Sequence, residues 1–215
     1  MIAEKRVITQ HELQKLLDIM ISSGRRVIGP VIRDGVIGYD DVESIKEFPI
    51  GLTDEQTPGG YRLIEAPEPT YFGFSVGPDV WKKYLHSPKT ELWRARREGD
   101  NFLMTASSDN EENYAFVGVR ACELAAISRQ DHVLSGGEYI DRHYKTRREK
   151  TLLIAVNCGK AGGSCFCHSM GTGPEAKSDF DMLLTELPQE SEHLFLVEAG
   201  SPAGHELLQR LLSFS

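Results

Sequence analysis

Near the start of the chain, apolar residues recur at the spacing of one face of an α-helix. A capping box, Thr9-Gln-His-Glu12, precedes this pattern, and Gly24 follows it as a stop signal. The sequence therefore predicts an amphipathic helix whose apolar stripe belongs to the core. The stripe consists of Leu13, Leu16, Leu17 and Met20.

The pattern then changes to short apolar runs with strand character. Residues 26–32 and 35–39 flank Asp34-Gly35, a common hairpin turn, and predict two paired strands. Glycine, proline and polar residues fill 49–60, which predicts a loop, and extended structure is expected again over 61–64. A short helix is expected between Gly77 and Pro88. Its expected buried side chains are Val80, Trp81, Tyr84 and Leu85, and Trp93 is also expected at a helical position in the packing.

The second half of the chain alternates strand and helix patterns. Residues 102–105 and 114–119 predict the strands of a hairpin, and the second runs directly into a helical segment at 120–127. An apolar run at 152–156 completes a predicted strand–helix–strand unit with parallel strands. The remaining predicted elements are extended segments at 182–187 and 194–197 and an amphipathic helix at 204–214.

These elements predict an α/β or α+β fold, with a mixed sheet and flanking helices. We expect an N-terminal α+β region at residues 1–100 and an α/β region at 101–215, or one continuous domain.

Three of the four cysteines lie within ten residues, in a glycine-rich loop expected at the end of a central strand. They are Cys158, Cys165 and Cys167. Convergent thiolates suit a soft metal ion or an iron–sulfur cluster. The C-x6-C-x-C spacing lacks the paired knuckles of a structural zinc site, so zinc is a poorer match. Inert buried thiols and redox or nucleophilic chemistry remain as alternatives.

The fourth cysteine, Cys122, falls in the first turn of the helix predicted after the strand at 114–119. Amides at a helix N-terminus lower the pKa of a thiol and favour the thiolate, which is the form that binds metal. Neighbouring parallel strands end at the same sheet edge, so we expect Cys122 and Cys158 at one edge.

Composition narrows the function classes. A formal net charge of -8, with no basic block to outweigh it, argues against a nucleic-acid partner. No stretch approaches the roughly 18 apolar residues of a membrane span, and the first residues lack an apolar signal region. Four cysteines without a disulfide framework fit a reducing compartment, so the expected location is cytoplasmic. The hydrolase and dinucleotide motifs G-x-S-x-G, H-E-x-x-H and G-x-G-x-x-G are missing.

Several strings across residues 25–186 resemble one family, the sulfhydrogenase beta subunits and anaerobic sulfite reductase A subunits, in its amino-terminal region. The strings are Thr53-Asp-Glu-Gln-Thr-Pro-Gly-Gly-Tyr-Arg-Leu63, Val76-Gly-Pro-Asp-Val-Trp81, Gly118-Val-Arg-Ala-Cys-Glu-Leu-Ala-Ala126, Asp141-x-His-Tyr-Lys-x-Arg-Arg148, Val156-Asn-Cys158 and Cys165-Phe-Cys-His-Ser-Met-Gly-Thr-Gly-Pro174.

The resemblance implies an electron-transfer subunit that works between a flavin-bearing partner and a catalytic hydrogenase or sulfite reductase subunit. Members of the family also carry a carboxyl-terminal ferredoxin-like region with C-x-x-C-x-x-C-x-x-x-C-P runs, and this sequence contains none of them. We therefore expect the front portion of a longer protein, a separated domain, or a member without that relay. A docking or scaffold module that holds zinc, or only free thiols, is the alternative function.

Four cysteines match the number of ligands of a 4Fe-4S cluster, so Cys122, Cys158, Cys165 and Cys167 are the predicted ligands. Glu123, Asp141 and His168 are reserve ligands. Their simpler interpretations are an acid in a first helical turn, a turn residue and an exposed loop histidine, respectively. Arg120 is expected on a solvated face, with contact to phosphate or a partner's acids as the alternative.

Overall fold

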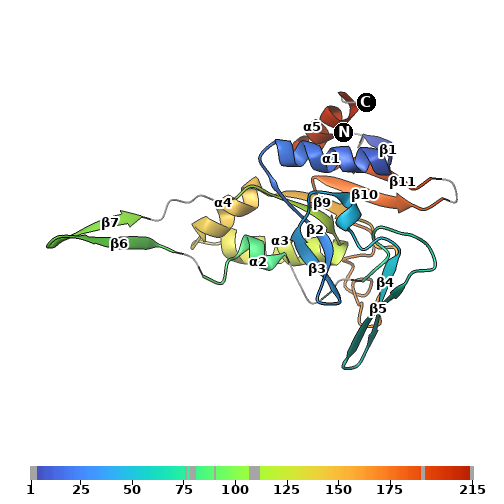
Figure 1. The fold of residues 1–215 in the computed structure, drawn as a ribbon, viewed down its shortest axis with the longest axis horizontal. Helices are drawn as coiled ribbons and strands as arrows, with labels where there is room; N and C mark the ends of the chain where they lie inside the picture. Colours follow the sequence, from blue (N-terminus) through green and yellow to red (C-terminus); the bar gives the residue numbers. More distant parts are fainter. Residues whose placement is uncertain are drawn as a thin grey trace.

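The computed structural model describes residues 4–75, 77, 81–89, 91–106, 112–189 and 192–213. Its main feature is a seven-stranded mixed sheet in the order β1-β11-β10-β9-β8-β2-β3 (Figure 1). The central strands β2, β8, β9 and β10 run parallel, and antiparallel strands complete both sides. The strands are β1 (Lys5–Thr9), β2 (Arg26–Arg33), β3 (Val36–Asp41), β8 (Tyr114–Val119), β9 (Leu152–Val156), β10 (Met182–Leu187) and β11 (Leu194–Ala199).

Helices cover both faces of this sheet, so the fold is α+β with a mixed sheet and flanking helices, as predicted. Two of them lie together on one face, and the others lie on the opposite face (Figure 1). The first pair is α1 (Gln10–Ser22) and α5 (Pro202–Ser213); the others are α2 (Lys82–Leu85), α3 (Ala121–Ser135) and α4 (Arg142–Lys150). A short 3-10 turn at Ile45–Glu47 lies beside α1, and Ile45 packs into the same core as the α1 stripe. The sheet takes strands from both sides of residue 100. No helix in the described ranges is long and apolar enough to cross a membrane.

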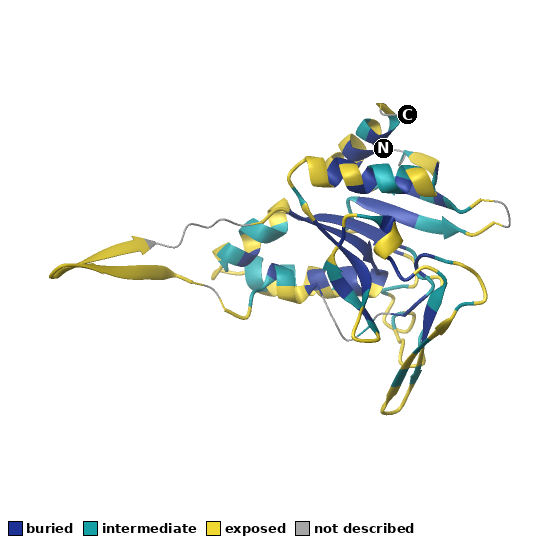
Figure 2. Ribbon diagram, in the orientation of Figure 1, coloured by how far each residue is buried: buried dark blue, intermediate teal, exposed yellow. Residues whose placement is uncertain are grey.

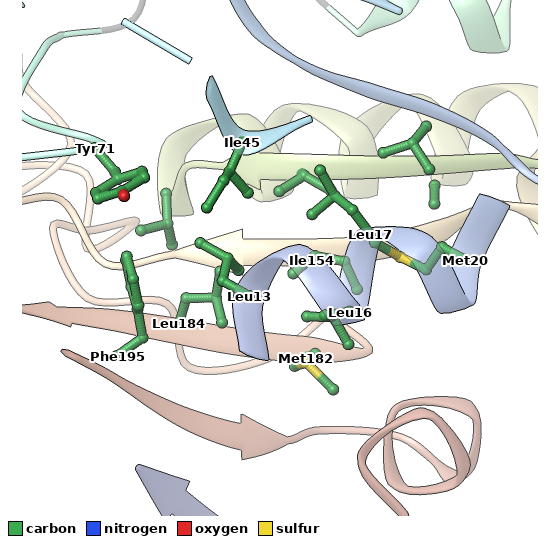
Figure 3. Packing of buried hydrophobic residues seen from close by; sticks show 14 of the residues in the cluster. Leu13, Leu16, Leu17, Met20, Ile45, Tyr71, Ile154, Met182, Leu184 and Phe195 are labelled. Atoms are coloured by element: carbon green, nitrogen blue, oxygen red, sulfur yellow. The ribbon is translucent and has the colours of Figure 1, made fainter. Parts of the chain in front are cut away.

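Two hydrophobic cores result, because side chains alternate across each strand. In β9, Ile154 packs into the core under α1 and α5, whereas its neighbour Leu153 packs under α3 and α4. Both faces of β9 are therefore apolar, and all five of its residues are buried. The predicted stripe of α1 packs onto the sheet beside Phe195, as Figure 3 shows.

Two local sequence signals near the start of the chain are confirmed: the capping box before α1 and the hairpin turn between β2 and β3. Thr9 and Glu12 form the expected capping box, with the Thr9 Oγ1 accepting from the Glu12 amide at 3.2 Å. The turn between β2 and β3 places Asp34 at φ 50° and Gly35 at φ 76°. Positive φ at both central residues is what a two-residue hairpin needs, which explains the aspartate–glycine pair.

Two further hairpins leave the sheet, and the sequence pattern misread both. The segment 49–60, expected as a loop, contains β4 (Leu52–Thr57), which pairs with β5 (Gly60–Glu65). Extended structure over 61–64 is confirmed. The predicted strand at 102–105 is present within β7 (Asn101–Ala106), but it pairs with β6 (Trp93–Glu98) and not with β8.

The tryptophans have opposite surroundings. Trp81 is buried as expected and lies against Phe116, with ring centroids 4.6 Å apart. Trp93 was expected in the packing, but it lies on β6 with 57% of its surface exposed. Of the helix expected after Gly77, the structure shows α2 with Leu85 buried; Val80 lies outside the described residues, as do positions 76, 78 and 79 of the resemblance.

Candidate metal centre

The carboxyl ends of β8 and β9 form the frame of the candidate site. The two strands are adjacent and parallel, with Ala115 opposite Leu152 and Val117 opposite Ile154. β8 leads through Arg120 into α3, so Cys122 is the second residue of that helix. β9 ends two residues before Cys158. The expectation that Cys122 and Cys158 lie at one edge of the sheet, at the end of a central strand, is therefore confirmed.

A bulge sets the direction in which β8 leaves the sheet. The register shifts between Val117 and Val119, and Gly118 between them has φ 92°. A Cβ at Gly118 would lie 3.1 Å from the Phe72 ring, so both backbone angle and space favour glycine here. The bulge turns Arg120 into the protein and starts α3 beside the cysteine loop.

The loop after β9 folds back over the start of α3. Cys158 donates its amide to the Pro174 oxygen at 3.3 Å, and Thr172 donates its amide to the Cys167 oxygen at 2.9 Å. A Cβ at Gly173 would lie 3.0 Å from the Cys167 Sγ and 3.4 Å from the Ala121 Cβ. Gly173 therefore lets Cys167 and the first turn of α3 approach each other.

The sulfur atoms of the other two loop cysteines are held by backbone groups. The Cys158 Sγ donates to the Lys160 oxygen at 2.9 Å, and the Cys165 Sγ accepts from the Gly162 amide at 3.2 Å. Cys122 and Cys165 are exposed, and Cys158 and Cys167 are half-buried. In the described part of the chain, no three cysteine, histidine or acidic side chains converge closely enough to hold a metal ion.

The electrostatics of Cys122 differ from expectation. Removal of water around the thiol, followed by the negative charges of Glu123, Cys167 and Cys158, raises the pKa of Cys122 to about 11. The predicted lowering by the helix N-terminus is therefore wrong: although Cys122 as a whole residue is exposed, partial loss of hydration at its thiol and the neighbouring negative charges outweigh the lowering by the backbone hydrogen bond at Cys122. The influence of Cys158 and Cys167 on the Cys122 thiol agrees with the placement of these residues at the carboxyl ends of β8 and β9.

Arg120 is a supporting residue that the sequence did not reveal. It was expected on a solvated face or as a phosphate contact, but it is buried beneath the site with 1% of its surface exposed. Its guanidinium donates to the backbone oxygens of Phe72 at 2.7 Å, Phe74 at 3.2 Å and Asn157 at 3.3 Å. Arg120 thus ties the ends of β8 and β9 to the segment 72–74.

Lysine 160 anchors the cysteine loop to the β4–β5 hairpin. Its Nζ donates to the Thr53 Oγ1 and to the Asp54 backbone oxygen, and lies 3.9 Å from the Asp54 carboxylate. The buried Asp54 carboxylate also accepts from the Ser75 amide at 2.7 Å. These buried polar contacts explain why a segment rich in polar residues forms an ordered strand.

The three reserve ligands lie in different settings. Glu123 occupies the first turn of α3, where it accepts from the Arg120 amide at 2.8 Å and the Tyr39 hydroxyl at 3.2 Å. Burial raises the pKa of Glu123 to about 7, although these donors oppose the shift. Asp141 is the N-cap of α4, accepting from the Tyr144 amide, and His168 is an exposed loop residue. The simpler interpretations therefore hold for His168 and, in part, for the other two.

A cavity of about 320 Å³ lies between α3 and residues 171–179, and none of the four cysteines lines it. Arg129 and Lys177 line it together with Glu175 and Asp179, so cations and anions balance. The turn at Gly171 is closed by its own amide, which donates to the His168 oxygen at 3.1 Å. With two cationic and two anionic side chains, the cavity has no net charge that would favour an anion.

Comparisons with protein-family models, with curated proteins and with solved structures give no match, so the resemblance of the motifs to the sulfhydrogenase and sulfite reductase subunits stays a prediction.

Proposed function

We propose that this chain is an iron–sulfur electron-transfer component of a cytoplasmic, multisubunit anaerobic oxidoreductase of the hydrogenase or sulfite reductase type. Cys122, Cys158, Cys165 and Cys167 are its proposed 4Fe-4S ligands. The observation that carries the proposal is the adjacency of β8 and β9, which brings Cys122 and the cysteine loop to one edge of the sheet.

The chemistry of the donor set fits a cluster better than it fits a structural zinc ion. Four thiols match the ligand number of a 4Fe-4S cluster, which supplies one-electron transfer when bound. The amide of Gly162 already points at the Cys165 sulfur, and amide donors to sulfur tune clusters of this kind. The side chains require a local rearrangement, because the Cys158 thiol must give up its bond to the Lys160 oxygen.

The chain's own residues would hold this neighbourhood in place. Arg120 fixes the strand ends, Lys160 fixes the loop against β4, and Gly173 allows Cys167 to approach α3. Two large apolar side chains of the loop, Phe166 and Met170, are more than half exposed beside the cysteines. Exposed apolar surface at a redox site suits contact with a partner subunit.

Anaerobic reconstitution tests the proposal directly. The chain should incorporate about four irons and four sulfides and turn brown, as four thiolate ligands require. Cys122→Ala should impair assembly as much as Cys165→Ala, because loss of either ligand leaves one iron open. Ser164→Ala, in the same loop, is the matched control and should load normally. Incorporation no greater than in a variant without all four cysteines would end the cluster proposal.

A docking or scaffold module with zinc or free thiols is the second candidate. It is favoured by the present side-chain positions, in which no three potential ligands of the described residues converge and two sulfurs are satisfied by backbone groups. A colourless protein with bound zinc, or with four titratable thiols after anaerobic reconstitution, would support this candidate. Metal analysis and thiol titration on the same sample separate the two.

The cluster proposal also predicts that the chain works through its partners. The sequence contains no ferredoxin-like cysteine runs to continue an electron relay. The isolated, cluster-loaded chain should therefore show no hydrogenase, sulfite reductase or NAD(P)H-dependent turnover with artificial electron carriers. Substantial turnover without added subunits would indicate a self-contained enzyme.

A further inference from the structure

The hairpin of β6 and β7 projects away from the rest of the molecule as an arm (Figure 1). Every residue of β6 is exposed, and Figure 2 shows the exposure continuing along β7. In the described residues the two strands pair only with each other. An isolated two-stranded hairpin is marginally stable in water, and at least one more strand is usually needed to support it.

Large apolar side chains make up much of the arm's surface. The register places Ala95 opposite Met104 and Arg97 opposite Phe102, so these four residues share one face. Trp93 lies on the same face, because side chains two residues apart point the same way. Phe102 and Met104 are 67% and 58% exposed. A contiguous apolar face of this kind marks an interaction surface.

The outer edges of the two strands differ in charge. β6 contains Arg94, Arg96, Arg97 and Glu98, whereas β7 contains no charged residue. Charged side chains on edge strands prevent pairing with another chain. Each of the other strands at an edge in the described ranges carries at least two charged residues: β1, β3, β4 and β5. Among the edge strands of the described residues, β7 is thus the one without charged side chains that would oppose pairing with another chain.

We propose that β7 of one chain pairs antiparallel with β7 of a second copy about a twofold axis, giving a four-stranded sheet β6-β7-β7-β6. A twofold (C2) interface brings the same surface of both copies together, so an uncharged β7 edge meets a second uncharged β7 edge. Pairing through β6 instead would set arginines of the two copies against one another. Pairing through β7 satisfies the outer backbone groups of both strands and joins the two apolar faces.

The charge distribution disfavours close contact between the bodies of two copies. The segment 92–106 contains three arginines, Glu98 and Asp100, so its formal charge is +1. Because the whole chain has a net charge of -8, the remaining residues together carry -9. Two such bodies repel at close range, but the repulsion is screened beyond roughly 8 Å at physiological ionic strength. Arms that project from the bodies allow pairing while the acidic bodies stay apart.

Sedimentation and light scattering of the full chain over a wide range of protein concentration test the proposal. The expected mass is twice the chain mass of 24.0 kDa. Leu103→Glu is the decisive variant, because its carboxylate can pair with Arg96 across the hairpin while adding a negative charge to β7 of both copies. It should weaken dimerisation at least about tenfold. Ala95→Glu adds the same charge to β6 and should leave the dimer intact.

Hydrogen exchange gives a second measurement that does not depend on mass. Amides on the outer side of β7 should be protected in the wild-type protein and in Ala95→Glu, and should exchange freely in Leu103→Glu. A wild-type chain that is monomeric at every concentration would overturn the proposal. So would a Leu103→Glu variant that is folded by circular dichroism and dimerises as the wild type does.

Discussion

Strands β8 and β6 have the same length and opposite surroundings. All six residues of β8 are buried between two layers of helices, and all six residues of β6 are exposed in the arm. The first strand carries the frame of the candidate metal centre, and the second carries none of it. The difference indicates that the central sheet supplies rigidity to the cysteines, while the arm offers a surface whose residues can change without disturbing the fold.

The largest expected effect comes from removing one phenylalanine ring from each region. Phe116→Ala in β8 deletes a fully buried ring that stacks on Trp81, and it should cost about 3–5 kcal/mol of unfolding free energy. Phe102→Ala in the arm, compared at a protein concentration low enough to keep the chain monomeric, should change that free energy by no more than about 0.5 kcal/mol. Urea denaturation measures both. Equal losses would show that the arm belongs to the same cooperative unit as the sheet.

Arginines provide the second comparison. Arg120→Met leaves two buried backbone oxygens and one partly buried oxygen without their donor, and it should destabilise the protein by about 2–3 kcal/mol. The variant should also load less iron, because the ends of β8 and β9 lose their tie. Arg96→Met in the arm, at an exposed site, is the control and should load normally. A stable Arg120→Met protein with normal iron content would remove Arg120 from the support of the site.

The sequence predicted the central region far better than the arm, and the reason is physical. Hydrophobic periodicity reports burial, so the buried strands at 152–156 and 182–187 were located correctly. The same rule fails where apolar residues stay exposed, which is why Phe102 suggested a partner for β8. It also fails for buried polar residues, and Arg120 and Asp54 were therefore missed.

The candidate site was predictable as far as the backbone determines it. A strand that leads into a helix, followed by a second parallel strand, is enough to place Cys122 and Cys158 at one edge. The directions of the individual thiols depend on the Lys160 tether and on contacts such as that between Gly173 and Cys167, which join residues distant in sequence. Neither contact has a signal in the spacing of the cysteines.

A smaller, pH-dependent effect is expected at the β4–β5 hairpin, which lies between the two extremes. Burial disfavours the Asp54 carboxylate, but hydrogen bonds from Ser75 and Gln56 and the charge of Lys160 prevail and lower its pKa. Its contribution is present above the unfolded pKa of about 3.9 and is lost as pH falls through the lower folded pKa. Asp54→Asn should cost about 1.5–3 kcal/mol at neutral pH.

Chemical denaturation at several pH values tests this prediction. The gap in unfolding free energy between the wild type and Asp54→Asn should narrow steadily as the solution is made more acidic than the unfolded pKa of Asp54. A gap that stays constant down to strongly acidic pH would mean that the charge of Asp54 contributes nothing to the anchoring of the loop.

The smallest effect concerns the backbone of the arm. Brief trypsin treatment at low protein concentration should cut first after Arg94, Arg96 or Arg97, because exposed hairpins are preferred sites of nicking. The nicked protein should keep the melting temperature of the body within about 1–2 °C. First cleavage at Arg148 or another site on the helices would contradict the contrast between the regions.

The sheet order also has a consequence for biosynthesis. β11 lies between β1 and β10, so β1 has no neighbouring strand in the sheet until β11 is made. Lys5 pairs with Glu198, roughly 190 residues later, and at 5–20 residues per second the ribosome needs about 10–40 s to cover that distance. α1, which follows β1 directly, can pack against the strands made soon after it, whereas β1 stays unpaired until β11 is made. The sheet is complete only when β11 has been made. A chain halted before residue 194 leaves β1 and one side of β10 without a paired strand, and such an unpaired edge can pair with another chain.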